Sequence, residues 1–391
     1  MKIMIVNSLY YPYKFGGAEI SVQFLAEELV KRNITVRIIT LNNSDEIIYD
    51  TINGVEIVSV PLQNIYWPYS SDSHGVFKKI QWHFRDTINQ SMAEVFKKQL
   101  NEFKPDLVHT NNLAGFSVSI WNMVKACKLP LVHTARDYYL FHPNSTLFNK
   151  GMNMSVDSIS VKLLSYLKKK TSQKVDAFVG ISEFISHFHK DNGFAKKAEH
   201  RHIYNPINKI NFNKKQVQPC LTIGFLGRLT SEKGFDIFIK FARKYSKDIK
   251  FVAAGNPSSS EDSRELCLLA QKAGIELKGY IPASELLSIV DALLLPTKWN
   301  EPFGRVVAEA AISGIPVFTN LTGGVKEISE HYNWVRAIEE FEPSIIRKLQ
   351  TLADNSEDVN QPFNGSHICE QYISLYSEVL NKKLTPGINE D

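Results

Sequence analysis

Short, nearly continuous apolar runs alternate with amphipathic stretches along the whole chain. The runs are rich in β-branched residues, which is typical of parallel strands with helices on both faces. Residues 18–32 and 235–245 instead place apolar side chains at helical spacing. The alternation predicts an α/β protein with two doubly wound sheets. The predicted strands are 2–7, 35–40, 106–111, 129–135 and 177–182 in a first series, and 221–227, 250–255, 292–297 and 316–320 in a second.

A polar segment separates the two series of strands. Residues 205–219 are flanked by prolines and have no apolar periodicity, as expected of a linker. The sequence therefore predicts one domain over 1–205 and another over 206–366. A length of 391 residues, with 43% hydrophobic and 22% charged residues, agrees with two globular domains and excludes a disordered or fibrous chain.

Targeting and redox signals are weak. No apolar run approaches the roughly 18 residues of a membrane span, and the first residues predict a strand rather than a secretion signal. The four cysteines lie far apart, which disfavours a zinc knuckle or a disulfide framework. A cytoplasmic protein is therefore expected.

The charge distribution and one helical segment are compatible with contact between the protein and a membrane. Residues 1–205 carry a net charge of +6 and the remainder −2, an excess that suits a solvated surface, anionic lipid or a phosphorylated ligand. Ile159, Leu163, Tyr166 and Leu167 share one helical face, with Lys168–Lys170 after them. Such a helix either lies on a membrane or packs onto its own core, and the second arrangement is the commoner one.

Two motifs of the second half are suited to a phosphorylated ligand. The stretch from Pro296 to Glu309 leaves a predicted strand and enters a helix, so its Gly304 lies at a helix N-terminus, where phosphates bind. Arg228 and Lys233 lie on a loop after another strand, and two cations there can neutralise a pyrophosphate. A charged surface loop would look the same. The G-x-G-x-x-G fingerprint of dinucleotide enzymes does not follow either first strand.

The second half resembles the retaining glycosyltransferases of family 4, which have the GT-B fold. The resemblance covers nearly all of residues 221–330. It is weaker in the first half, where it rests on Gly16-Gly17, on the sequence from Asp106 to His109 and on that from Thr134 to Tyr138. The matching elements of the second half are Gly227-Arg-x4-Lys-Gly234, the pair Glu301 and Glu309, Gly314-Ile-Pro-Val317 and Thr322-Gly-Gly-Val-Lys-Glu327.

This resemblance implies a fold and an activity. Two Rossmann-like doubly wound domains would face a central cleft, the first (1–205) binding the acceptor and the second (206–366) the nucleotide-sugar. A C-terminal helix at about 367–381 would pack back on the first domain. The implied reaction is that of a hexosyltransferase, which moves a sugar from a nucleotide-sugar, UDP- or GDP-linked, to a hydroxyl with retention of configuration.

The resemblance also implies roles for individual residues. Arg228 and Lys233 would bind the diphosphate, and Glu309 would accept hydrogen bonds from the ribose hydroxyls. Glu301 would face the sugar, and Glu301, Arg228 and Lys233 would form the catalytic set. Backbone N–H groups near Phe303 and Gly304 would hold sugar hydroxyl or phosphate, the base would lie near Leu277, and Gly16 and Gly17 would close over the donor.

On the acceptor side the candidates are His133, Arg136 and Asp137. Many family members have a histidine where this chain has Arg136, and that histidine is often assigned to sugar contact or catalysis. His133 lies three residues earlier, on a predicted strand, where a lone histidine is more often part of the core.

The expected partners follow from the same reading. The acceptor would be a saccharide, a lipid-linked or a small molecule in polysaccharide, glycolipid or glycoconjugate assembly. Neither a metal nor another cofactor is expected, and no nucleic acid. Peripheral contact with the inner face of a membrane through the basic first half is a further expectation. A nucleotide-sugar epimerase or phosphorylase of the same fold, or a non-catalytic nucleotide-sugar-binding subunit, remains an alternative.

Overall fold

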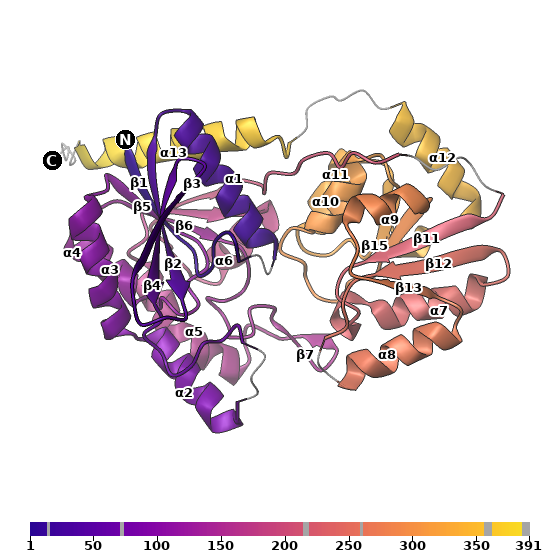
Figure 1. The fold of residues 1–391 in the computed structure, drawn as a ribbon, viewed down its shortest axis with the longest axis horizontal. Coiled ribbons are helices and arrows are strands. Elements are labelled where there is room, and N and C mark those ends of the chain that lie inside the picture. Colours follow the sequence, from indigo (N-terminus) through magenta and orange to yellow (C-terminus); the bar gives the residue numbers. More distant parts are fainter. Residues whose placement is uncertain (14–15, 71–73, 214–218, 259–260, 356–361, 385–391) are drawn as a thin grey trace. The chain divides into compact units, whose positions relative to one another are not determined.

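The computed structural model describes residues 1–13, 16–70, 74–213, 219–258, 261–355 and 362–384. The chain forms two compact units, each built on its own sheet with flanking helices (Figure 1). Unit 1 contains Met1–Thr146, Ser155–Pro206 and the described residues from Asn364 on. Unit 2 contains Leu147–Met154 and Ile207–Phe363.

Unit 1 has an eight-stranded sheet in the order β10-β9-β6-β5-β1-β2-β4-β3. Its neighbouring strands pair in parallel, except for the antiparallel pair of β3 and β4. The strands are β1 (Lys2–Val6), β2 (Thr35–Asn42), β3 (Ile48–Ile52), β4 (Val55–Pro61), β5 (Leu107–Thr110), β6 (Leu131–Ala135), β9 (Ala177–Gly180) and β10 (Glu199–His202). The helices are α1 (Gly17–Lys31), α2 (Val76–Thr87), α3 (Gln90–Phe103), α4 (Ser119–Ala126), α5 (Ile159–Ser172), α6 (Glu183–Asp191) and α13 (Gly365–Leu384).

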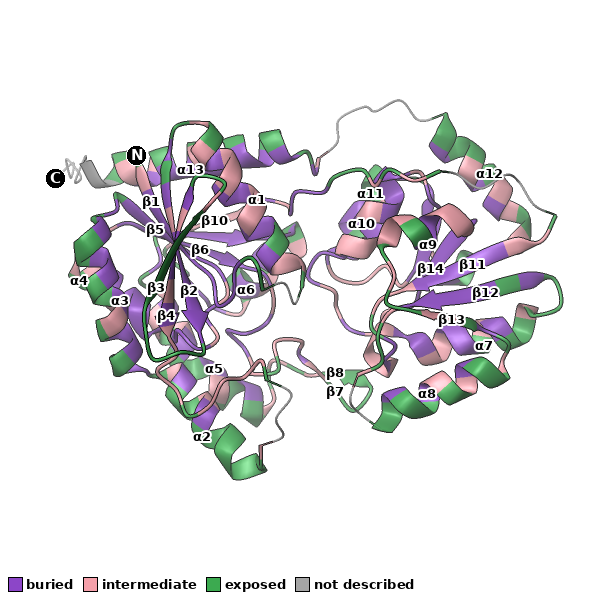
Figure 2. Cartoon of the chain, viewed as in Figure 1, coloured by how far each residue is buried: buried purple, intermediate pink, exposed green. Residues whose placement is uncertain are grey.

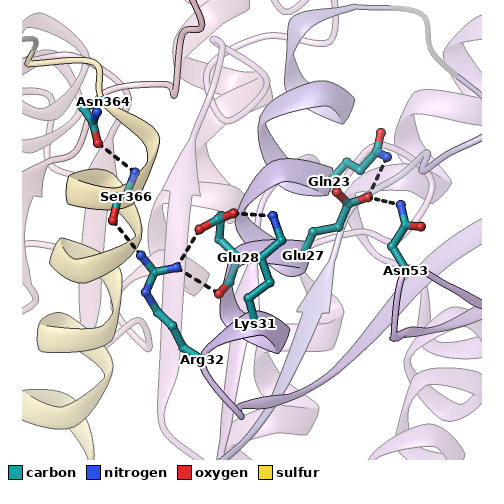
Figure 3. A network of polar contacts seen from close by, with 8 residues as sticks. All are labelled: Gln23, Glu27, Glu28, Lys31, Arg32, Asn53, Asn364 and Ser366. Carbon is teal, nitrogen blue, oxygen red and sulfur yellow. Dashed lines mark hydrogen bonds and ion pairs between the residues drawn. The ribbon is translucent and has the colours of Figure 1, made fainter.

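The last helix, α13, belongs to the core of unit 1. Its Ile368, Tyr372 and Leu375 pack in one buried cluster with residues of β1 and α1. Outside this core, the Arg32 guanidinium donates hydrogen bonds to Glu28 of α1 (2.6 Å) and to Ser366 of α13 (2.7 Å), as Figure 3 shows. The helix is thus fixed to α1 by apolar and polar contacts.

Unit 2 has a six-stranded parallel sheet in the order β13-β12-β11-β14-β15-β16. Counted along this unit the order is 3-2-1-4-5-6, that of the Rossmann fold, in which ligands bind where the order reverses. The reversal lies between β11 and β14. The strands are β11 (Leu221–Leu226), β12 (Ile249–Ala254), β13 (Glu276–Gly279), β14 (Ala292–Leu295), β15 (Val317–Thr319) and β16 (Val335–Ala337). The helices are α7 (Phe235–Tyr245), α8 (Glu261–Lys272), α9 (Ala283–Ile289), α10 (Arg305–Ile312), α11 (Val325–His331) and α12 (Pro343–Asp354).

A short hairpin, β7 (Phe148–Asn149) and β8 (Met152–Asn153), joins unit 2 although the sequence places it within 1–205. Its Asn153 accepts a hydrogen bond from the Asn300 N–H at 3.2 Å and donates to the Lys298 carbonyl at 3.3 Å. These contacts hold the hairpin on the loop after β14. Of the expected linker, residues 214–218 lie outside the described residues.

The nine strands expected from the sequence are all present, with ends shifted by one or two residues. Strands β3, β4, β10, β13 and β16 were not among the expected strands. The edge strands β3, β10 and β13 are exposed or half-buried, and β10 and β13 carry few apolar residues. Strand β4 is largely buried, and β16 has only three residues. The expectation that Ile159, Leu163, Tyr166 and Leu167 pack onto their own core is wrong. These side chains are exposed on α5, whose buried face carries Val161, Ser165, Lys168 and Ser172.

Candidate active site

The loops after β11 and β14 meet at the carboxyl edge of the second sheet. Gly234, which ends the loop after β11, has φ +77°, and a Cβ there would lie 1.8 Å from the Pro296 carbonyl oxygen. Only glycine permits this approach. The Lys298 N–H donates to the Glu232 carbonyl at 3.0 Å, so the two loops form a single surface.

Lys233 and Glu301 come together at the centre of this surface. Lys233 Nζ lies 2.7 Å from Glu301 Oε2 and 4.9 Å from the centre of the Trp299 ring. Both side chains line one pocket with Gly304 and Arg305. The two residues that the sequence assigned to phosphate and sugar therefore share a site, at the point where the strand order reverses.

The Thr322-Gly-Gly motif supports the backbone of Glu301. The Gly324 N–H donates to the Glu301 carbonyl at 2.9 Å. A Cβ on Gly323, which has φ +62°, would lie 2.3 Å from that same oxygen. The glycines of this motif thus hold the loop that carries Glu301, which explains their place in the sequence.

Gly304 opens helix α10 at the floor of the pocket. Its φ is +91°, and a Cβ there would lie 2.6 Å from Val325 Cγ2, so the position favours glycine. The first backbone N–H groups of a helix have no partner within the helix and attract anions. The Phe303 side chain is buried against Phe363, so only the backbone of Phe303 is suited to a ligand contact.

Glu309 does not line the pocket itself but pairs with Arg305, which does. Arg305 Nε lies 2.7 Å from Glu309 Oε1, one helical turn away, and Arg305 itself lines the pocket. Burial raises the pKa of the Glu309 carboxyl. Arg305 was not predicted from the sequence. Its position directly after Gly304, in the first turn of a helix expected to bind phosphate, was the available signal.

Arg228 lies apart from this pocket. Its guanidinium pairs with Glu232 at 2.5 Å, its side chain is 59% exposed, and it is not among the residues that line the Lys233 pocket.

Leu277, expected near the base, lies on the edge strand β13, which pairs with β12. The Gly255 N–H donates to the Gly279 carbonyl at 2.8 Å, and Gly255 also abuts the Gly227 backbone. The segment expected to hold the base therefore ends at the same sheet edge as Gly227.

Lys298 and Asn153 hold the loops of this site in place, and neither was predicted from the sequence. Lys298 Nζ contacts Ser231 Oγ at 2.9 Å and Asp236 Oδ2 at 2.8 Å, which pins the two loops together. Asn153 fixes the same loop from the hairpin. Nothing in the local sequence of Asn153 indicates this contact, because its partners lie about 150 residues later.

In unit 1, Gly16 and Gly17 open helix α1 after strand β1. The Gly16 N–H donates to Glu19 Oε2 at 2.9 Å, and the Gly16 backbone is extended, with φ −163°. A Cβ on Gly16 would meet only this carboxylate, at ordinary contact distance. The packing of unit 1 therefore does not itself require glycine at position 16.

The three acceptor-side candidates have different surroundings. His133 is buried in β6 beside Thr110 Oγ1 (3.0 Å), and burial lowers its pKa to about 3. Its ring is a neutral part of the core, which disfavours acceptor contact. Arg136 donates to Asn111 Oδ1 at 2.9 Å and to Asn205 Oδ1 at 2.7 Å. Asp137 accepts from the Tyr139 N–H, and burial raises its pKa to about 6.

The described residues contain neither a candidate metal site nor a candidate membrane-spanning helix. No group of three or more His, Cys, Asp or Glu side chains there could hold a metal ion. No helix in the described part of the chain combines the length and apolar character needed to cross a bilayer.

Comparisons with known proteins agree with the geometry. A family model described as Glycosyltransferase Family 4 matches residues 15–209, and one described as Glycosyl transferases group 1 matches residues 207–361. An uncharacterized 42.6 kDa protein of the cps region of Klebsiella pneumoniae is 41% identical over 96% of this chain and 100% of its own length. The chain belongs to glycosyltransferase family 4. The expected family is thus confirmed, and the chain is a glycosyltransferase.

Further relatives fit this family. An uncharacterized glycosyltransferase of Methanocaldococcus jannaschii is 28% identical over 85% of this chain and 83% of its own length. Among solved structures, a sucrose-phosphate synthase of Thermosynechococcus elongatus has a TM-score of 0.65 and 17% identity, covering 97% of this chain and 99% of its own. Anabaena HepE, solved with UDP and glucose, has a TM-score of 0.64 and 18% identity, covering 96% and 99%. These likenesses confirm the GT-B fold class of two Rossmann-like units.

Proposed function

We propose that this glycosyltransferase moves a hexose from a nucleotide-sugar, UDP- or GDP-linked, to an acceptor hydroxyl and retains the anomeric configuration. The observation that carries the proposal is the pocket of Lys233, Glu301, Gly304 and Arg305 at the switch point of the second sheet. That Anabaena HepE has been solved with UDP-glucose supports a uridine donor.

The residues of the pocket suit the parts of such a donor. Lys233 and the first turn of α10 would carry the diphosphate, with Arg228 contributing from the exposed side. Glu309, released from Arg305, would accept from the ribose hydroxyls, and Glu301 would face the sugar. The base would lie at the end of β13 near Leu277, and Gly16 and Gly17 would close over the donor.

The proposed chemistry places its largest charge on the leaving group. The bond from the anomeric carbon to the phosphate oxygen breaks, and a bond from that carbon to the acceptor oxygen forms on the same face. The acceptor proton passes to the departing phosphate oxygen. Lys233 and the α10 N-terminus stabilise the developing negative charge. With these positive groups in place we propose that transfer needs no metal ion.

The proposed acceptor is a saccharide in polysaccharide assembly, carried on a lipid. The relative in the Klebsiella pneumoniae cps region, a capsule region, supports this class. Such an acceptor implies work at the cytoplasmic face of a membrane, with Arg136 and Asp137 as candidate contacts for the acceptor. No nucleic acid partner is proposed.

A donor screen followed by a transfer assay tests the proposal. Thermal shift with UDP-, GDP-, ADP- and dTDP-sugars should single out one donor, because a bound ligand raises the melting temperature. Incubation of labelled donor without acceptor should leave the sugar unchanged, whereas an epimerase would convert it. Transfer to a lipid-linked saccharide should persist in EDTA. If no nucleotide-sugar shifts the melting temperature, the proposal fails; if one binds without transfer to any acceptor, the chain is a binding subunit.

A further inference from the structure

Helices α2 and α5 of unit 1 expose large apolar side chains. On α2, Phe77 and Phe84 are 72% and 74% exposed, and on α5, Ile159 and Leu163 are 85% and 74% exposed. Figure 2 shows the exposed outer side of α2. Soluble proteins rarely gather so many such side chains on one face without a partner. We call these exposed side chains together the apolar surface; they are Val76, Phe77, Ile80, Phe84, Ile88, Ile159, Leu163, Tyr166 and Leu167.

Buried polar contacts fix this orientation. Lys168 on the inner side of α5 is buried and donates from Nζ to the Tyr139 carbonyl at 2.8 Å. Asp86 on the inner side of α2 is buried and accepts from the Tyr139 hydroxyl at 2.8 Å. Both helices are thus anchored to Tyr139 by polar side chains, which lie beside one buried apolar side chain on each helix, Val161 on α5 and Trp82 on α2. Most of the large apolar side chains of the two helices nevertheless face outward, whereas a surface helix ordinarily turns its apolar face to the core.

The two helices also share a groove. Ile80 and Phe84 of α2 line it together with Leu163 and Leu167 of α5, and its volume is about 650 Å³. The apolar side chains therefore form one continuous surface across both helices rather than two separate stripes.

The charges around the apolar surface are basic. Lys78, Lys79 and Arg85 are exposed on α2, and Lys162 and Lys170 on α5. The acidic side chain within these two helices is the buried Asp86; Asp157, just before α5, pairs with Lys162 at 2.9 Å. A second copy docked on this surface would bring lysines against lysines. An anionic lipid surface instead offers headgroups to the lysines and an apolar interior to the aromatic and branched side chains.

We propose that the apolar surface of α2 and α5 docks this enzyme onto an anionic lipid bilayer. Phe77, Phe84, Ile159 and Leu163 enter the boundary between headgroups and acyl chains, and the neighbouring lysines contact the headgroups. The docking deepens the proposed function and rests on its lipid-carried acceptor, because it brings the enzyme to the surface where that acceptor lies.

Flotation of the full chain with vesicles tests the docking. We expect binding to vesicles of phosphatidylglycerol and phosphatidylcholine, weakening with added salt, and little binding to phosphatidylcholine alone. The double variant Phe77→Ser/Leu163→Ser should lower partitioning at least about ten-fold, because it removes two apolar side chains from the boundary. The matched control Leu268→Ser changes an exposed leucine of α8 in unit 2 and should partition like the unaltered chain.

Charge reversal tests the basic rim. Each basic side chain near an anionic surface contributes about five-fold to binding, so Lys78→Glu/Lys79→Glu should weaken it at least about 25-fold. Lys97→Glu/Lys98→Glu makes the same charge change on α3, at exposed positions away from the apolar surface, and should weaken it far less.

Several outcomes would overturn the docking. The first is that the chain does not partition into anionic vesicles, and the second is that the variants and their controls lose vesicle binding equally. The third is that light scattering shows a dimer, which Phe77→Ser/Leu163→Ser converts to a monomer. UDP affinity is measured on the same variants without lipid and should not change. Vesicle binding without transferase activity would leave the docking intact and refute the proposed function, and the converse result would refute the docking alone.

Discussion

Lys233 is the side chain on which the proposed phosphate contact most depends. Lys233→Ala should lower UDP affinity about ten-fold or more, since a charge-assisted hydrogen bond contributes about 1.5–3 kcal/mol. Arg228→Ala should cost less, because Arg228 is mostly exposed and already paired with Glu232. Calorimetry with UDP measures both, with the exposed Lys240→Ala as the control. Undiminished affinity in Lys233→Ala would remove this lysine from the site.

The two glutamates should separate nucleotide binding from sugar transfer. Glu309→Gln should weaken UDP and donor alike, because both carry the ribose. Glu301→Gln should leave UDP affinity unchanged or raise it, since this carboxylate competes with phosphate for Lys233 at 2.7 Å. Its turnover should fall, because the sugar loses its partner. Calorimetry with UDP and kinetics with the identified donor measure the split; equal loss of UDP affinity in both variants would contradict it.

Asp86 should make the stability of the chain depend on pH. Burial raises its pKa to about 6, so the folded chain keeps a proton that the unfolded chain, with a pKa near 3.9, has lost. The stability from this proton is present below pH ~4 and is lost as the pH rises through about 6. The free energy of unfolding of the unaltered chain, relative to that of Asp86→Asn, should therefore fall by about 2–3 kcal/mol between pH 4 and pH 6.5.

Urea unfolding at a series of pH values measures this difference. Asp50→Asn, on the exposed strand β3, makes the same chemical change at the surface and is the control. A pH-independent difference between Asp86→Asn and the unaltered chain would show that the folded and unfolded states titrate Asp86 alike.

Motif spacing in the sequence predicted that Lys233, Glu301 and Gly304 lie at one sheet edge, because they lie between a buried strand and the helix that follows it. The structure places these three residues around one pocket. The side-chain pairings were not predictable. Arg305 with Glu309, and Lys298 with Ser231 and Asp236, depend on how two loops pack. The outward face of α5 was also unpredictable, because helical spacing shows that a face is apolar and not what covers it.

At the scale of loops, Gly234 should limit both stability and site geometry. Gly234→Ala meets an unfavourable φ and also the Pro296 carbonyl oxygen, 1.8 Å from the new Cβ. Gly274→Ala is a matched control with φ +75° and nothing within 4 Å of its Cβ. Gly274→Ala should cost about 1 kcal/mol of unfolding free energy, and Gly234→Ala clearly more.

The two glycine variants should also differ in function. Gly234→Ala should lower UDP affinity because the loop that it displaces carries Lys233, whereas Gly274→Ala should not. Chemical unfolding and UDP calorimetry measure the two effects. Equal costs in both assays would mean that the contact with Pro296 relaxes freely.

At the scale of the whole molecule, the chain order and the units do not coincide. The segment that forms β7 and β8 is part of unit 2 although unit 1 precedes and follows it, and α13 returns to unit 1 after unit 2 is complete. Alternation of strands and helices predicted two sheets and a boundary near residue 205. It could not assign the hairpin, because four strand residues carry too little pattern to indicate their neighbours.

Because α13 packs in unit 1 and the pocket lies in unit 2, we expect substitutions in α13 to change the stability of the chain without changing nucleotide binding. Tyr376 of α13 contacts His109 Nδ1 in β5 at 2.7 Å, and both residues are buried. Tyr376→Phe leaves this nitrogen without its partner and should cost about 1–3 kcal/mol of unfolding free energy. The exposed Tyr13→Phe should cost little.

UDP affinity should be the same in Tyr376→Phe as in the unaltered chain, because Lys233, Glu301 and Arg305 all lie in unit 2. Hydrogen exchange should localise the two effects. Tyr376→Phe should lower protection in β5 and α13, and UDP should raise it over residues 227–234 and 298–305. If Tyr376→Phe weakened UDP binding as much as Lys233→Ala does, the pocket of unit 2 could not supply most of the UDP affinity, and unit 1 would have to contribute more than the closure of Gly16 and Gly17 over the donor.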